Sequence, residues 1–130
     1  MLSNLRAYVT VLEGLAHAPE PDFLGNPDKA GNTKYHFVIA IECCIDIANH
    51  VIASEDLRFP KDNADSFAVL VDEGILDEAL REPLRSMAKL RNRLVHLYWD
   101  IDDRRVYEYL HGSLGDLNRF AQAIADRFRE

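Results

Sequence analysis

The stretch KYHFVIAIECCIDIANHVIAS, residues 34–54, decides the fold class of this chain. Its apolar residues recur at intervals of three and four, the spacing that places side chains on one face of an α-helix. These apolar residues are Val38, Ile41, Ile45, Ala48 and Ile52. The polar positions between them are Glu42, Asp46, Asn49 and His50. We therefore predict a long helix from about Lys34 to Ser54, buried along one face.

The same periodicity marks the other helices that we predict. A first helix covers residues 3–16, a short one covers 65–72 and a longer one covers 77–99. A final helix follows Asp102 or Asp103, either of which can cap its N-terminus. The apolar stripe of this final helix comprises Val106, Leu110, Leu114, Leu117, Ala121, Ile124 and Phe128.

Turn-forming residues separate the predicted helices. The proline-rich HAPEPDF (17–23) ends the first helix, GNPDKAGNT (25–33) is typical of a turn, and Gly74 ends the short helix. Pro83 lies inside a helical segment, so we expect a kink there or a restart with Pro83 in the first turn. No segment alternates apolar and polar residues as a strand does. The sequence therefore predicts an all-α, up-down bundle of four to five helices in a single domain, residues 1–130.

The composition is that of a soluble globular domain, with 48% apolar and 28% charged residues. No apolar run approaches the roughly 20 residues that cross a bilayer, and the N-terminus lacks the basic and apolar regions of a signal peptide. Cys43 and Cys44 are neighbours within a predicted helix, and no Cys/His spacing suggests a zinc site. We expect reduced thiols and a cytoplasmic protein without membrane association.

The distribution of charge is more informative than its sum. The net charge of −7 argues against a protein that coats nucleic acid non-specifically. Residues 81–105 nevertheless carry seven basic and only four acidic side chains. A local basic zone on an acidic body favours a specific anionic ligand. The alternative interpretation is a solvated helix face.

Residues 91–98, RNRLVHLY, interrupt the apolar pattern of their helix. Arg91 falls within an apolar series that comprises Leu80, Leu84, Met87, Leu94 and Tyr98. A charge at such a position destabilises the fold unless it is paired or serves a site. One interpretation pairs Arg91 with an acid of the long helix, Glu42 or Asp46. The other makes Arg91 part of a functional site.

His96 projects to nearly the opposite side of the same helix. That side carries a basic ridge that leads to His96, formed by Arg81, Arg85, Lys89, Asn92 and Arg93. At roughly 100° per residue, Arg91 and His96 lie about 140° apart, so one straight helix cannot present both to one site. Either the helix distorts near its end, or two copies of the chain each contribute one residue. The broad apolar face of this helix favours the second option, a homodimer.

The segment RNRLVHLY also matches a known motif: an arginine, four residues, a histidine, one residue and a tyrosine. This motif resembles the signature of HEPN-domain RNases, specifically the HepT-like toxins of toxin–antitoxin pairs. The flanking segments 35–53 and 67–110 also resemble the family, and the likeness covers about residues 35–125.

The resemblance implies a HEPN-like helical dimer that cleaves RNA without a metal or another cofactor. It makes this chain the toxin of a type VII-like pair, with Arg91 and His96 as catalytic residues at the dimer cleft. Arg85, Lys89, Asn92 and Arg93 are then candidates for binding the RNA phosphates. The implied partner is an MNT-type nucleotidyltransferase, an antitoxin that transfers AMP to the motif tyrosine, here Tyr98. Tyr107 and Tyr109 are the next candidate acceptors.

Two alternatives remain open at this stage. The chain could be a non-catalytic, nucleotide-binding accessory subunit of a nucleotidyltransferase, because binding and catalysis require the same arginine and histidine. It could also be a structural helical dimer in which the motif is incidental.

Overall fold

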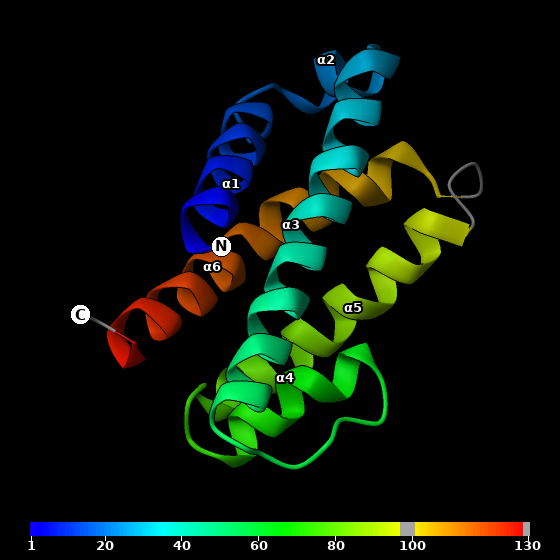
Figure 1. Cartoon of the computed structure of the whole chain (residues 1–130). Coiled ribbons are helices and arrows are strands. Elements are labelled where there is room, and N and C mark those ends of the chain that lie inside the picture. The colour runs from blue at the N-terminus through cyan, green and yellow to red at the C-terminus, as the bar shows by residue number, and fades with distance from the viewer. Residues whose placement is uncertain (97–100, 129–130) are drawn as a thin grey trace.

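The computed structural model describes residues 1–96 and 101–128, and these residues form helices and connecting turns with no strand. Figure 1 shows the arrangement of the elements. In chain order they are α1 (Leu2–Ala16), α2 (Glu20–Leu24), α3 (Pro27–Ser54), α4 (Asn63–Asp72), the 3-10 helix η1 (Glu78–Leu80), α5 (Arg81–His96) and α6 (Asp103–Arg127). The predicted all-α bundle is confirmed. The prediction that a helix continues to residue 99 lies partly outside the described residues.

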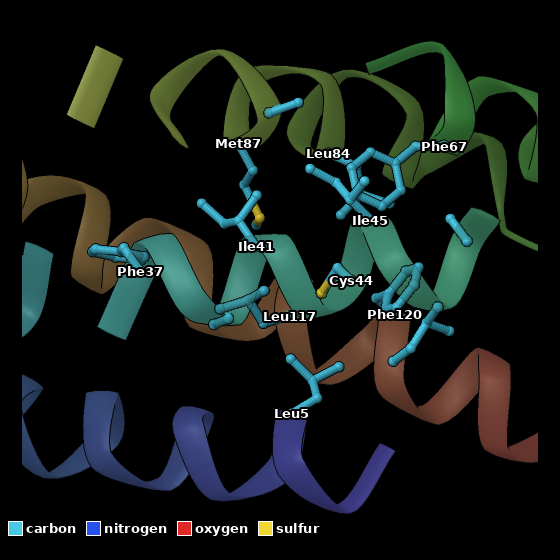
Figure 2. Packing of buried hydrophobic residues seen from close by; sticks show 14 of the residues in the cluster. Leu5, Phe37, Ile41, Cys44, Ile45, Phe67, Leu84, Met87, Leu117 and Phe120 are labelled. Carbon is cyan, nitrogen blue, oxygen red and sulfur yellow. The ribbon is translucent and has the colours of Figure 1, made fainter. Parts of the chain in front are cut away.

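Helix α3 is the central element of the bundle. It packs against α1 and α6 on one side and against α4 and α5 on the other (Figure 1). Figure 2 shows this core from close by, with side chains from all five of these helices meeting around α3. The largest fully buried side chains include Phe37 and Ile41 of α3, Phe67 of α4 and Phe120 of α6. The periodic apolar stripe of residues 34–54 thus organises the whole core.

The predicted turn at residues 25–33 is wrong, because α3 already begins at Pro27. The side chain of Asn26 accepts hydrogen bonds from the backbone N–H groups of Asp28 and Lys29, at 3.0 and 3.3 Å. Proline is well suited to the first helical position, where its missing N–H has no intrahelical partner anyway. The residues that suggested a turn therefore start a helix. The short helix α2, built on Pro19 and Pro21, was also not predicted.

Other predicted boundaries agree with the structure. Gly74 has a positive φ of 74° after α4, a conformation that glycine adopts without strain. Asp102 caps α6 by accepting a hydrogen bond from the backbone N–H of Arg104 at 3.0 Å. The segment that contains Pro83 restarts as α5 after η1, with Pro83 in its first turn. Helix α4 begins slightly earlier than predicted, because the side chain of Asp62 caps it.

Two side chains of α6 hold the C-terminal end of α1. The hydroxyl of Tyr107 donates a hydrogen bond to the carbonyl oxygen of Ala18 at 2.9 Å, and Nε2 of His111 lies 3.0 Å from the carbonyl oxygen of Ala16. The ring of Tyr107 also packs on Phe23, with centroids 5.0 Å apart. Tyr107 therefore has a structural role in this fold.

Helix α3 is long and apolar enough to cross a membrane by length and composition, with a mean hydropathy of 1.6 over an 18-residue window. Half of that window is buried inside the protein, where α3 forms the centre of the bundle. The predicted absence of such an apolar stretch is therefore wrong by this measure. Both cysteines of α3 are free thiols. Complete burial raises the pKa of the Cys44 thiol.

Candidate active site at the end of α5

Helix α5 uses its apolar side within its own chain. Leu84, Met87, Leu90 and Leu94 are all buried in the core, and Val95 is the large apolar residue of α5 that stays exposed, at 46%. The broad apolar face of α5, which suggested contact with a second copy, is therefore covered largely by the core of its own chain. The homodimer stays a prediction.

Helix α5 runs beside α3 (Figure 1), and Arg91 of α5 forms an ion pair with an acid of α3. Its Nη2 and Nε donate to the same oxygen of Glu42, Oε1, at 2.8 and 3.1 Å. Its Nη1 donates to Oδ1 of Asn92 at 3.1 Å. The interpretation that pairs Arg91 with an acid of the long helix is thus confirmed for Glu42. Asp46, the other acid considered, lies one turn further along α3. The Arg91 side chain is half-buried, with 23% exposed, so it remains partly accessible to solvent.

His96 is the last residue of α5 and its side chain is exposed. Lys89, Asn92 and Arg93 are exposed as well, so this part of the predicted basic ridge faces solvent. Arg81, the first residue of the ridge, is half-buried and pairs with Asp72 and Glu78. Arg85 is also exposed and lies 3.4 Å from Glu82, one turn earlier. Among the residues that the structure describes, no hydrogen bond or ion pair involves the His96 side chain.

The structure does not bring Arg91 and His96 together within one chain. Helix α5 is continuous from Arg81 to His96, so a distortion between the two residues is not seen. Their side chains keep the angular separation of about 140° that an α-helix gives to positions five apart. Arg91 points to α3, whereas His96 points to solvent. Tyr98, the predicted AMP acceptor, lies outside the described residues.

A polar hollow of about 310 Å³ opens beside Arg91, and sequence reasoning missed it. Its lining comprises Glu42, Ile45, Asp46, Asn49, Asn63 and Arg91. The signal in the sequence was the polar series at positions 42, 46 and 49, whose spacing places all three on one face of α3. A larger hollow, about 510 Å³, lies between α5 and α6, and Tyr109 lines it. Within residues 1–96 and 101–128, no group of three or more His, Cys, Asp or Glu side chains could hold a metal ion.

Comparison with known proteins places these residues in a family. The model of the Ribonuclease HepT-like family matches residues 5–124, which is most of the chain. This chain belongs to the HepT-like ribonuclease family. It is 34% identical over 83 residues to the mRNA nuclease HepT of Shewanella oneidensis, and the match covers 64% of this chain and 62% of that relative. The aligned segment is thus shorter than two thirds of the nuclease.

Two further relatives are similar over more of their length. A protein of Archaeoglobus fulgidus named as an RNase is 28% identical over 116 residues, which is 89% of this chain and 86% of the relative. The structure of a tri-AMPylated Shewanella oneidensis HEPN toxin in complex with an MNT antitoxin superposes with a TM-score of 0.87 at 23% identity. The superposition covers 96% of this chain and 93% of the toxin. The HEPN fold is therefore shared over nearly the whole chain.

Proposed function

We propose that this chain is a metal-independent endoribonuclease and the toxin of a toxin–antitoxin pair. One observation carries the proposal: in a chain that matches a ribonuclease family over residues 5–124, Arg91 and His96 lie on one helix with a basic exposed face. The relatives named as nucleases support the same activity. The RNA substrate and the helical fold are consistent with a cytoplasmic protein.

The chemistry of RNA suits these two residue types. RNA carries its own nucleophile, the 2′-hydroxyl, so cleavage needs a group that accepts a proton, a group that donates one and a positive charge near the phosphate. Histidine titrates near neutral pH and serves either proton-transfer role. The guanidinium of Arg91 binds phosphate oxygens and stabilises the charge that develops on them. The 2′-oxygen attacks phosphorus and the 5′-oxygen leaves with a proton, which yields a 2′,3′-cyclic phosphate.

The products of the reaction test the activity. Purified protein should cleave RNA with EDTA present and leave 2′,3′-cyclic phosphate ends, which analysis of the RNA termini detects. Binding of RNA or nucleotides without cleavage would instead favour the accessory-subunit alternative.

The angular separation of Arg91 and His96 supports a site that is shared between two copies. In a homodimer, Arg91 of one protomer and His96 of its partner can face each other across a cleft, which a single helix does not allow. Mixed dimers test this arrangement. Arg91→Ala and His96→Ala chains, each inactive when purified separately, should regain part of the activity when mixed, because one of the two sites is then intact. No recovery in mixed dimers would contradict a shared site.

We also propose Tyr98 as the site where a partner nucleotidyltransferase of the MNT type inactivates the toxin. The similar HEPN toxin in complex with its MNT antitoxin carries AMP groups, which supports the same regulation here. Each AMP would add about 329 Da together with negative charge near the phosphate-binding residues. Tyr98→Phe should prevent the mass increase and stay toxic when the antitoxin is co-expressed. Tyr109 is the next candidate, since the Tyr107 hydroxyl is bonded to Ala18.

A further inference from the structure

The polar hollow beside Arg91 has a composition that the cleavage chemistry does not account for. Glu42, Asp46 and Asn49 contribute one wall from α3, and Asn63, the first residue of α4, contributes another. Arg91 reaches in from α5. Binding and cleaving a phosphodiester require positive charge and a proton carrier, whereas this hollow offers two carboxylates and two amides.

The carboxylates decide which part of an RNA can enter the hollow. The guanidinium of Arg91 is already held by Glu42, so Asp46 leaves the hollow with a net negative charge. A second phosphate would be repelled there. An uncharged group that donates hydrogen bonds is favoured instead, because Asp46 supplies acceptor oxygens only.

Asn49 adds donors at a fixed position. Its Oδ1 accepts a hydrogen bond from the hydroxyl of Ser66 at 2.7 Å, which turns the amide NH₂ group away from Ser66. The hollow therefore combines carboxylate acceptors with amide donors one helical turn apart on α3. This combination matches the edge of a nucleobase.

Guanine fits the arrangement best among the four bases. Its Watson–Crick edge places two N–H donors beside a carbonyl acceptor, so one carboxylate accepts two hydrogen bonds while an amide donates one. We propose that the hollow is a base-recognition subsite in which Asp46 and Asn49 select guanine next to the phosphate that Arg91 binds. The inference rests on the proposed ribonuclease function and adds its specificity. Contacts to phosphate position a nucleic acid, whereas contacts to base edges provide sequence selection.

The experiment compares single-stranded oligonucleotides that differ in one base. Wild-type protein should cleave next to guanine with a kcat/KM about tenfold higher than next to inosine, which lacks only the exocyclic amine. Asp46→Asn should reduce this ratio to near one. In Asp46→Asn, replacing guanine by inosine should cause no further loss of kcat/KM, because the two changes remove the same hydrogen bond. Asp56→Asn is the matched control, since Asp56 is exposed outside the hollow and its positive φ of 55° suits asparagine as well.

The outcomes separate this inference from the function on which it rests. Cleavage without base preference, or a preference that survives Asp46→Asn, would overturn the guanine subsite and leave the ribonuclease intact. If the wild type cleaves no RNA, the proposed function fails. In that case, fluorescence anisotropy measures the affinity for the same oligonucleotides. Tighter binding of the guanine oligonucleotide than of the inosine oligonucleotide would support the guanine subsite, and equal binding would overturn it. Loss of the dimer in Asp46→Asn would also overturn the guanine subsite, because it would show that Asp46 pairs with a basic side chain of a second copy.

Discussion

Two arginine–carboxylate clusters, one between α4 and α5 and one between α5 and α3, differ in how many carboxylates each arginine binds. The α4–α5 network comprises Arg58, Asp65, Asp72, Glu78 and Arg81. In it, Arg58 donates to both oxygens of Asp65, at 2.8 and 3.1 Å, and also to Asp72. Arg81 bonds the other oxygen of Asp72 at 2.7 Å and also binds Glu78. Each arginine of the network therefore serves two carboxylates.

Arg91 is held differently. It directs two of its nitrogens to a single oxygen of Glu42, and it borders a hollow. The α4–α5 network joins the chain before α4 to the start of α5, which is a structural role. In the Arg91–Glu42 pair, by contrast, we expect the guanidinium to exchange part of its bonding for a phosphate. Because Arg58 and Arg81 each bind two carboxylates and Arg91 binds one, we expect a structural role for the first two and a binding role for Arg91.

The largest effect that we predict is at the end of α5. His96→Ala should lower RNA cleavage by about 100- to 10,000-fold, the range that general acid–base groups contribute. The thermal midpoint should stay unchanged, because the side chain is exposed. Cleavage of labelled RNA and thermal unfolding monitored by circular dichroism measure the two properties. His17→Ala, an exposed histidine at the end of α1, is the matched control. Full activity in His96→Ala would remove His96 from the mechanism.

Alanine substitutions of Arg91 and Arg58 test the comparison between the two clusters directly. Arg91→Ala should lower cleavage at least about 100-fold, because a positive donor to the phosphate is lost. Its unfolding free energy should change by no more than about 1 kcal/mol, since the pair with Glu42 is partly exposed. Arg58→Ala should do the opposite, with a lower thermal midpoint and unchanged cleavage. Loss of both cleavage and thermal stability in Arg91→Ala would mean that the Arg91–Glu42 pair is structural.

Acid should weaken the α4–α5 network. The hydrogen bonds from Arg58, together with the backbone N–H of Lys61, lower the pKa of Asp65 to about 2. A carboxyl with a lowered pKa stabilises the fold above its unfolded pKa, near 3.9, and this stabilisation is lost as pH falls toward 2. Urea unfolding between pH 5 and 2 should therefore show a steeper loss of stability in the wild type than in Asp65→Asn. Parallel curves would show that Asp65 contributes nothing in this pH window.

The sequence predicted the helices whose apolar residues repeat, because burial along one face requires that spacing. It failed at Asn26 and Pro27, where residues typical of turns serve as a cap and a first helical position. The contact between Arg91 and Glu42 could be anticipated, because Arg91 interrupts the apolar face of a helix that must pack on the long helix, and Glu42 is one of the acids of that long helix. The hollow could not, because it requires Asn63 of α4 to approach Asn49 of α3, and no local pattern encodes how two helices are placed.

The smallest predicted effect concerns the exposed residues of the basic ridge on α5. Lys89→Ala and Arg93→Ala should each weaken RNA binding only a few-fold, because each side chain is solvated and contributes through a phosphate contact. Each loss should lower the slope of log affinity against log salt by about 0.7, the value for one phosphate contact in a single strand. Fluorescence anisotropy in the His96→Ala background measures binding without cleavage. Arg6→Ala, an exposed arginine of α1, is the control and should leave the slope unchanged. If Lys89→Ala and Arg93→Ala give the same slope as this control, the ridge is an ordinary solvated face and the RNA takes another path to Arg91.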